Sequence, residues 1–493
     1  MLDEKPDPVK LDLKDPSLLE TRAYVGGKWI TKEKTFPVYN PANGDCIAHV
    51  TDMDVADTAN AIDVAYDAKA DWASWTGKER SAVLRKWHDL MIANADDLGT
   101  ILTAEMGKPF AEARGEILYG ASFIEWFAEE AKRVYGDVIP GHQRDKRLVV
   151  LKQPIGVVGS ITPWNFPNAM IARKVAPALA VGCTFVARPA ELTPLSALAM
   201  AVLAERAGVP AGVLNVIPSS DSSGVGKELC ANHKVAKITF TGSTRVGKIL
   251  MNQCADTIKK LSLELGGNAP FIVFDDADVD AAVEGAMIAK YRNNGQTCVC
   301  ANRIYVQSGV YDEFAAKLAE KAKSLTIGDG FDEGVTTGPL INEAALAKVE
   351  DHISDAVSKG AEVIEGGDRS DLGGTFFKPT VLTGVTPAMK VAKEETFGPV
   401  APLFKFDDEA DAVAMANDSE FGLAAYFYSR DLARVWRVSE ALETGMVGIN
   451  TGLISTEVAP FGGVKQSGLG REGSKYGIED FLEMKYLCMG EIS

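Results

Sequence analysis

Short apolar runs alternate with helical patterns throughout the part of the chain that follows Pro154. Five of these runs have strand character, and they cover residues 155–161, 183–187, 213–217, 237–241 and 261–265. Strands that alternate with helices predict βαβ units, which build a parallel sheet covered by helices on both faces. The carboxyl ends of such strands form a nucleotide crevice. We therefore expect a doubly wound α/β domain that binds a nucleotide cofactor.

A second alternating region begins at Pro270. Its pattern predicts a strand over 271–274, a helix over 281–291 and a strand over 303–306. The chain has 493 residues, which is too long for one ordinary core and long enough for two or three domains. We therefore expect a second doubly wound domain after the first.

Upstream of Pro154 the pattern is mainly helical. Residues 54–94 have helical periodicity, and a second amphipathic helix runs from Ile117 to Phe127. A short hairpin is predicted over 24–29, whereas residues 1–21 are charged and are expected to wrap the surface or fray. Two further segments, 147–151 and 478–489, have strand character and do not follow the helical periodicity.

Composition excludes several classes of function. The chain carries 51 basic and 68 acidic residues, a net charge of −17, which opposes nonspecific binding to nucleic acid or to an anionic membrane. No apolar run approaches the ~18 residues of a membrane span, and the first residues do not resemble a secretory signal. Seven scattered cysteines favour a reducing, cytoplasmic setting, and isolated histidines make a metal site unexpected.

The segment from Asn293 to Cys300 is typical of a turn that presents a nucleophilic thiol, and Cys298 is the candidate nucleophile. A thiol with the ordinary pKa of ~8.5 is mostly protonated at neutral pH, so it needs a lowered pKa or a nearby base. Glu264 is the candidate base, because it ends a strand-like run before two glycines. The alternatives are a buried inert thiol at Cys298 and a salt-bridged surface carboxylate at Glu264.

Five motifs carry a resemblance to a known family. They are residues 163–167, 240–243, 263–268, 295–298 and 395–399. In sequence, order and spacing the chain resembles the NAD(P)-dependent aldehyde dehydrogenase superfamily. Within it, residues 298–303 and 468–479 are most similar to the succinate-semialdehyde dehydrogenases.

The resemblance implies a covalent mechanism. The Cys298 thiolate attacks the aldehyde to give a thiohemiacetal, a hydride passes to a nicotinamide, and water activated by Glu264 hydrolyses the thioester. The amide of Asn165 and the backbone N–H of Cys298 would stabilise the oxyanion. Without the resemblance, Asn165 is equally well explained as a helix cap before a helix that starts near Ala169. The CoA-acylating relatives typically lack the glutamate, and a noncatalytic protein on this fold would be indicated by loss of Cys298 or Glu264.

The resemblance also implies a dinucleotide site. The run from Gly242 to Gly247 follows a strand and opens a helix, which suits a pyrophosphate. Glu191 would repel a 2′-phosphate on the adenine ribose, whereas Arg188, where lysine is usual, could pair with it. We therefore expect NAD as the cofactor and NADP as a second possibility. The expected cofactor residues are Ile161, Thr162, Trp164, Arg188, Ala190, Glu191, Gly226, Gly242, Ser243, Leu265, Glu395 and Phe397.

For the substrate, the resemblance implies a small carboxylated aldehyde whose carboxylate is held by Arg173, Arg292 and Ser455. Either arginine could instead pair with a structural acid. By this resemblance the expected substrate is succinate semialdehyde. Glutarate semialdehyde is the alternative, because the residues alone do not rank the two. Cys300, two positions beyond Cys298, leaves open a thiol redox sensor on the same fold.

The expected organisation is therefore α/β with two doubly wound parallel-sheet domains and a small β arm. The cofactor-binding domain would comprise residues 1–136 and 156–263, and the catalytic domain residues 264–476. By resemblance, residues 137–155 and 477–493 would form an oligomerisation arm of a homodimer or homotetramer.

Overall fold

A mostly parallel sheet of eight strands organises the first half of the chain in the computed structural model, which describes residues 6–492. In spatial order its strands are β2 (Lys28–Ile30), β1 (Ala23–Val25), β9 (Leu214–Val216), β8 (Thr184–Arg188), β7 (Val157–Ile161), β10 (Val235–Thr241), β11 (Lys260–Glu264) and β21 (Gly468–Leu469). The five neighbouring strands β9, β8, β7, β10 and β11 are parallel, as the sequence predicts. The predicted hairpin forms β1 and β2, and β1 extends the sheet by pairing antiparallel with β9.

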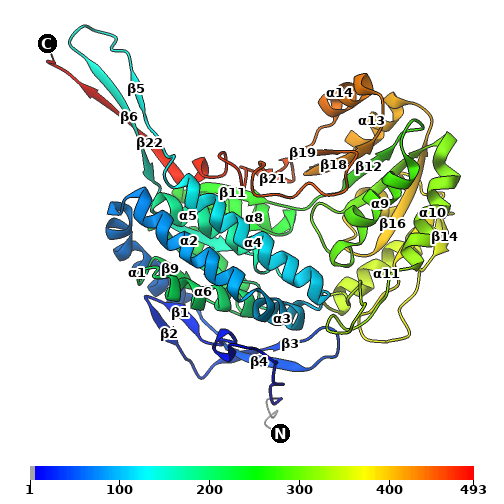
Figure 1. The fold of residues 1–493 in the computed structure, drawn as a ribbon, viewed down its shortest axis with the longest axis horizontal. Coiled ribbons are helices and arrows are strands. Elements are labelled where there is room, and N and C mark those ends of the chain that lie inside the picture. The colour runs from blue at the N-terminus through cyan, green and yellow to red at the C-terminus, as the bar shows by residue number, and fades with distance from the viewer. Residues whose placement is uncertain (1–5, 493) are drawn as a thin grey trace.

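Helices cover both faces of this sheet (Figure 1). They are α1 (Val55–Ser74), α2 (Gly77–Ala93), α3 (Ala95–Met106), α4 (Phe110–Glu130), α5 (Ala169–Val181), α6 (Leu195–Ala207), α7 (Ser222–Ala231) and α8 (Thr244–Cys254). The helical pattern predicted over 54–94 is two helices, because Trp75 is extended and Thr76 begins α2 with a capping box to Glu79. The predicted helix around Ile117–Phe127 is α4.

A sheet of seven strands organises the second half of the chain. Its order is β14 (Glu362–Glu365), β15 (Thr380–Thr383), β16 (Val400–Phe406), β13 (Ala301–Gln307), β12 (Ala269–Val273), β18 (Ala424–Tyr428) and β19 (Met446–Ile449). Only the edge strand β14 is antiparallel to its neighbour. The accompanying helices are α9 (Val279–Tyr291), α10 (Tyr311–Lys323), α11 (Glu343–Ser358), α12 (Lys390–Lys393), α13 (Glu409–Asn417) and α14 (Leu432–Ala441). The strands and the helix predicted between residues 271 and 306 are β12, α9 and β13.

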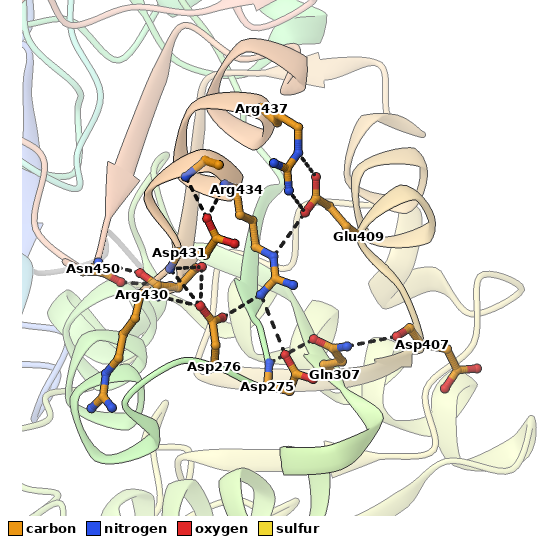
Figure 2. A network of polar contacts seen from close by, with 12 residues as sticks. Asp275, Asp276, Gln307, Asp407, Glu409, Arg430, Asp431, Arg434, Arg437 and Asn450 are labelled. Atoms are coloured by element: carbon orange, nitrogen blue, oxygen red, sulfur yellow. Dashed lines mark hydrogen bonds and ion pairs between the residues drawn. The ribbon is translucent and has the colours of Figure 1, made fainter.

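Ion pairs occupy the carboxyl edge of this second sheet (Figure 2). Asp276, which follows β12, accepts hydrogen bonds from the backbone of Arg430 at 2.8 Å and from Nη1 of Arg434 at 2.7 Å. Glu409 at the start of α13 pairs with Arg434 and with Arg437 of α14. Charged side chains of the protein therefore pair with one another at the edge where a doubly wound sheet usually binds a ligand.

Three antiparallel strands form an arm that projects from the body of the molecule, with the C-terminus at its far end (Figure 1). They are β5 (Asp137–Ile139), β6 (Arg147–Pro154) and β22 (Leu482–Met489). The strand predicted from residue 478 begins only at Leu482, because a 3-10 turn over Glu479–Phe481 precedes it. Several apolar side chains of the arm are exposed, among them Val138 (83%) and Met484 (73%).

Two short ribbons, β3 (Thr35–Tyr39) with β4 (Cys46–Thr51) and β17 (Phe421–Gly422) with β20 (Val464–Lys465), complete the fold. Residues 6–21 run over the surface as predicted, whereas residues 1–5 of that predicted segment lie outside the described part. Within residues 6–492, no helix has both the length and the apolar character needed to cross a bilayer.

Candidate active site

The three expected catalytic residues come from three separate connections. Glu264 is the last residue of β11, Asn165 lies between β7 and α5, and Cys298 lies in the turn between α9 and β13. Asn293, Asn294 and Gly295 in that turn all have positive φ, at 52°, 55° and 73°. Two successive non-glycine residues in this region are uncommon and cost of order 1 to 3 kcal/mol each, so the surrounding contacts must hold the turn in place.

The Cys298 side chain is half-buried, and burial raises the pKa of its thiol to about 12. The positive charges of Arg173 and Arg292 oppose that rise, whereas Glu395 and Glu264 add to it. The protein alone therefore keeps the thiol protonated at neutral pH. A base or a bound ligand must favour the thiolate for Cys298 to act as a nucleophile.

Glu264 is 3% exposed. Burial raises the pKa of its carboxyl well above the ordinary value, and the negative charge of Glu472 raises it further, while Arg173 and Lys174 oppose both effects. Its Oε2 has no hydrogen-bond partner among residues 6–492. A buried carboxyl with a raised pKa and a free oxygen is suited to accept a proton from water or from a thiol.

Asn165 is buried, and its Nδ2 donates a hydrogen bond to the carbonyl oxygen of Gln296 at 2.9 Å. The position at the start of α5 that a helix cap would occupy belongs to Asn168. The helix-cap explanation of Asn165 is therefore wrong. Its amide is instead directed at the turn that carries Cys298, where an oxyanion donor is needed.

A cavity of about 380 Å³ brings Asn165 and Cys298 together. Its walls include the expected cofactor residues Trp164, Gly242, Ser243, Leu265, Glu395 and Phe397. Oε1 of Glu395 accepts a hydrogen bond from the N–H of Gly267 at 3.1 Å, and burial raises the pKa of this carboxyl to about 7. The ring of Phe397, whose φ is +57°, meets Trp164 edge to face with centroids 5.6 Å apart.

A second cavity, of about 490 Å³, shares Pro163, Trp164, Thr241, Gly242 and Ser243 with the first. The remaining expected cofactor residues line it: Ile161, Thr162, Arg188, Ala190, Glu191 and Gly226. All twelve expected cofactor residues therefore lie along one continuous hollow at the carboxyl end of the first sheet.

The donors along this hollow fit a dinucleotide. Ser243 caps α8, so the positive end of that helix faces the cavity, where a pyrophosphate is favoured. Nε of Arg188 and Oγ1 of Thr241 are buried without a hydrogen-bond partner within the described residues. A Cβ added at Gly226 would meet Ile161 and Leu250 at an ordinary contact distance of 3.8 Å.

At the far end of the second cavity, Nη2 of Arg188 donates to Oε2 of Glu191 at 2.7 Å and to the carbonyl oxygen of Ser219 at 2.9 Å. The Arg188 side chain is 6% exposed and that of Glu191 is 44% exposed. The two residues expected to compete over a 2′-phosphate are thus paired with each other.

The three expected substrate residues do not line these two cavities. Arg173 is 1% exposed and lies 2.5 Å from Oε2 of Glu472, so it is paired with a structural acid. Arg292 is half-buried, with its guanidinium 5.4 Å from the centroid of the Phe166 ring. Ser455 is half-buried in the loop that follows β19.

Cys300 is fully buried, and its thiol donates to the carbonyl oxygen of Lys290 at 3.4 Å. Burial raises the pKa of this thiol as well. A packed thiol with a raised pKa is less reactive than an exposed thiolate, so the redox-sensor alternative gains no support from its position.

Sequence reasoning missed two buried charge groups at this site. Lys174 and Arg173 of α5 both pair with Glu472, and Lys108 pairs with Glu116 beside Asn165. The sequence did contain one signal for the first group. Arg173 and Lys174 lie within an otherwise almost entirely apolar helix, where a charged residue is usually paired. Among residues 6–492, no cluster of histidine, cysteine and acidic residues could hold a metal ion.

Comparisons with known proteins agree with this geometry. The chain is 64% identical over 484 residues to a glutarate-semialdehyde dehydrogenase of Pseudomonas aeruginosa, covering 98% of this chain and 100% of the relative. It is 63% identical over 482 residues to a succinate-semialdehyde dehydrogenase of Escherichia coli named for NADP(+), covering 97% of this chain and 100% of the relative. These relatives favour the dehydrogenase over the redox sensor.

Solved structures agree as well. The crystal structure of a succinate-semialdehyde dehydrogenase from Burkholderia pseudomallei superimposes with a TM-score of 0.96 at 64% identity, covering 97% of this chain and 99% of that one. The model of the family described as "Aldehyde dehydrogenase family" matches residues 29–487. The expected α/β fold with two parallel-sheet domains is confirmed, and the chain belongs to the aldehyde dehydrogenase family.

Proposed function

We propose that this aldehyde dehydrogenase oxidises a small carboxylated semialdehyde, succinate semialdehyde first, to the dicarboxylic acid. The observation that carries this substrate class is Arg292, whose positive charge acts on the Cys298 thiol from a half-buried position beside Phe166. A charged hydrogen bond from arginine to a substrate carboxylate contributes ~1.5 to 3 kcal/mol, enough to select against uncharged aldehydes. The semialdehyde dehydrogenases at 63% and 64% identity support the same class.

In this proposal Cys298 is the nucleophile and Glu264 is the general base. Glu264 takes a proton from the water that hydrolyses the thioester, and the proton of the Cys298 thiol passes to solvent when the thiol attacks the aldehyde. Asn165 and the Cys298 backbone N–H donate to the oxyanion. A bound nicotinamide would accept the hydride.

Arg292 is the proposed primary contact of the substrate carboxylate. Arg173 already faces the buried carboxylate of Glu472, so its charge is partly neutralised before a substrate arrives. We propose that Arg173 adds to the positive field at the thiol, and that Ser455 supplies a hydroxyl from the opposite loop.

Glutarate semialdehyde is the second candidate substrate. A specific observation favours it, because glutarate-semialdehyde dehydrogenases of Pseudomonas aeruginosa and Pseudomonas putida are each 64% identical to the chain over nearly its whole length. The two substrates differ by one methylene, which a pocket discriminates by only ~1 to 3 kcal/mol.

We propose NAD as the cofactor, with NADP as a usable second one. Glu191, which is paired with Arg188, places a negative charge beside the cavity at the expected adenine ribose. The Escherichia coli relative is named for NADP(+), which supports the second cofactor. The other expected contacts are the residues that line the two connected cavities.

We further propose the domain limits given above and a homodimer or homotetramer built through the arm. The exposed apolar side chains of Val138 and Met484 support an interface there. A cytoplasmic setting is proposed on the basis of the seven cysteines, none of which is paired in a disulfide.

The experiment that tests the function is a set of initial rates with succinate semialdehyde, glutarate semialdehyde and uncharged aldehydes of matched length, each with NAD and with NADP. The proposal expects both semialdehydes to exceed their uncharged counterparts in kcat/KM by about 10-fold or more. Equal kcat/KM for charged and uncharged aldehydes would contradict it.

A further inference from the structure

Three charged side chains from the link before α4 and from α4 itself reach the segments that carry the oxyanion donor and the nucleophile. Lys108 and Glu116 are buried, with side chains 1% exposed each, and Nζ of Lys108 donates to Oε2 of Glu116 at 2.6 Å. Glu112 lies on α4, one turn before Glu116, and is half-buried. Neither Lys108 nor the two glutamates line the connected cavities.

Each of these groups holds a specific backbone atom. Lys108 Nζ donates to the carbonyl oxygen of Asn165 at 2.8 Å. Oε1 of Glu116 accepts from the N–H groups of Asn168 and Ala169 at 2.9 and 3.1 Å, which fixes the start of α5. The ion pair of Lys108 with Glu116 therefore holds both ends of the segment 165–169. We call this pair, together with Glu112, the clamp.

Glu112 extends the clamp to the nucleophile's turn. Its Oε2 accepts from the backbone N–H of Asn293 at 2.9 Å. Nδ2 of Asn293 in turn donates to the carbonyl oxygens of Asn165 at 3.0 Å and of Gln296 at 3.3 Å. Asn293 is one of the residues with positive φ, so these bonds hold a conformation that the chain would not adopt by itself.

The link that carries Lys108 packs against a loop from the second half of the chain. Gly107, with φ of +85°, ends α3, and a Cβ there would lie 2.7 Å from Pro339. The N–H of Phe110 donates to the carbonyl oxygen of Gly330 at 2.9 Å, and Nδ2 of Asn294 donates to that of Gly338 at 2.9 Å. The link that carries Lys108 is thus seated against the 330–339 loop.

We propose that Lys108, Glu112 and Glu116 are positioning residues that set the oxyanion donor Asn165 against the Cys298 turn. They touch neither the reacting atoms nor the cavity, so they act through Asn165 and Asn293. The inference rests on the proposed role of Asn165 as the donor. A misplacement of about 1 Å at a reacting group can cost about 10²-fold in rate, so loss of the clamp is expected to lower kcat far more than it changes KM.

The test combines Lys108→Met with Asn165→Ala in a double-mutant cycle, with kcat and the pre-steady-state burst of reduced cofactor measured on the full-length protein. We expect Lys108→Met to lower kcat and the burst rate about 100-fold in the wild-type background, and less than about threefold in the Asn165→Ala background. Equal factors in both backgrounds would overturn the proposal. No loss of kcat in Asn165→Ala alone would overturn the donor assignment and the proposal with it.

Lys108→Met leaves Glu116 buried without its partner, which can unfold a protein. The paired change Lys108→Met with Glu116→Leu removes both charges and is better tolerated. We expect this variant to fold with a lowered melting temperature, because the N–H groups of Asn168 and Ala169 lose their acceptor, and to lose about 100-fold in kcat. A folded paired variant with wild-type kcat would overturn the proposal.

Glu105 supplies a matched control. It is buried, and its carboxyl oxygens accept from the N–H groups of Leu195 and Ser196 at the start of α6, as Glu116 does at the start of α5. Glu105→Gln is expected to lower the melting temperature and leave kcat within about twofold, whereas Glu116→Gln lowers kcat at least tenfold. Equal loss of kcat in both variants would mean that Glu116 has only a structural role.

Discussion

Nε of Arg173 lies 2.5 Å from Oε2 of Glu472, and neither side chain is more than 5% exposed. Arg292, by contrast, is half-buried beside Phe166. Both arginines lower the pKa of the Cys298 thiol, but their removal should have different consequences. Loss of Arg173 leaves a buried carboxylate short of one partner, whereas loss of Arg292 removes a charge–charge interaction with Glu112, which keeps its hydrogen bond from the N–H of Asn293.

Arg292→Met should lower kcat/KM for succinate semialdehyde by about 10- to 100-fold, because one charged hydrogen bond to the substrate carboxylate is lost. The kcat/KM for an uncharged aldehyde of the same length should fall by less than about threefold. Arg173→Met is expected to lower the melting temperature and to reduce kcat/KM for both substrates. Charged and uncharged aldehydes losing the same factor in Arg292→Met would contradict the substrate assignment.

Glu264→Gln should keep a burst of reduced cofactor and lose about 10²- to 10⁴-fold in steady-state turnover, because hydride transfer precedes the step that needs activated water. The pH dependence follows from the raised pKa of this buried carboxyl. A carboxyl with a raised pKa keeps its proton to higher pH, so wild-type turnover should rise with pH as the carboxylate forms. Stopped-flow and steady-state rates across pH check this, and full turnover in Glu264→Gln would sink the base assignment.

Alkylation by iodoacetamide reports the thiolate of Cys298 directly. Since burial raises the pKa of this thiol to about 12, the rate in the cofactor-free protein should rise about tenfold per pH unit from pH 7 to 9 without a plateau. The exposed Cys488 is replaced by alanine in the assay, and Cys298→Ala should abolish both the slow alkylation and aldehyde oxidation while NAD still binds. Arg292→Met should slow the alkylation, because the positive charge of Arg292 lowers the pKa of the Cys298 thiol. A plateau of the wild-type alkylation rate near pH 8 would refute the raised pKa.

The strands of the first sheet were predictable because βαβ periodicity is local, and β7, β8, β10 and β11 lie within a few residues of their expected limits. The twelve residues expected at the cofactor fall along one hollow for a similar reason, since the carboxyl ends of parallel strands share an edge. The break at Trp75 was missed because its signal is a single capping box.

The sequence could not assign partners to buried charges. Lys108 and Asn165 are 57 residues apart and Lys174 and Glu472 are 298 apart, and no periodicity links such positions. The same limit applied to Arg173, whose pairing with Glu472 depends on long-range packing. The motif around Cys298 carries the proposed chemistry, whereas the contacts that hold its turn could be seen only in the fold.

The ion pair between Arg188 and Glu191 determines the last prediction, the choice of cofactor. Glu191 is 44% exposed, so its repulsion of a 2′-phosphate is screened and amounts to about 1 kcal/mol, roughly a fivefold preference for NAD. Glu191→Ser removes that repulsion and frees Nη2 of Arg188 for the phosphate, so the ratio of kcat/KM for NADP to that for NAD should rise by about 5- to 100-fold. Arg188→Lys should lower this ratio in the Glu191→Ser background, because an ammonium cannot reproduce the planar fork. Glu228→Ser on α7, outside both cavities, should leave the ratio unchanged. A wild type that already prefers NADP strongly would show that Arg188 dominates despite its pairing.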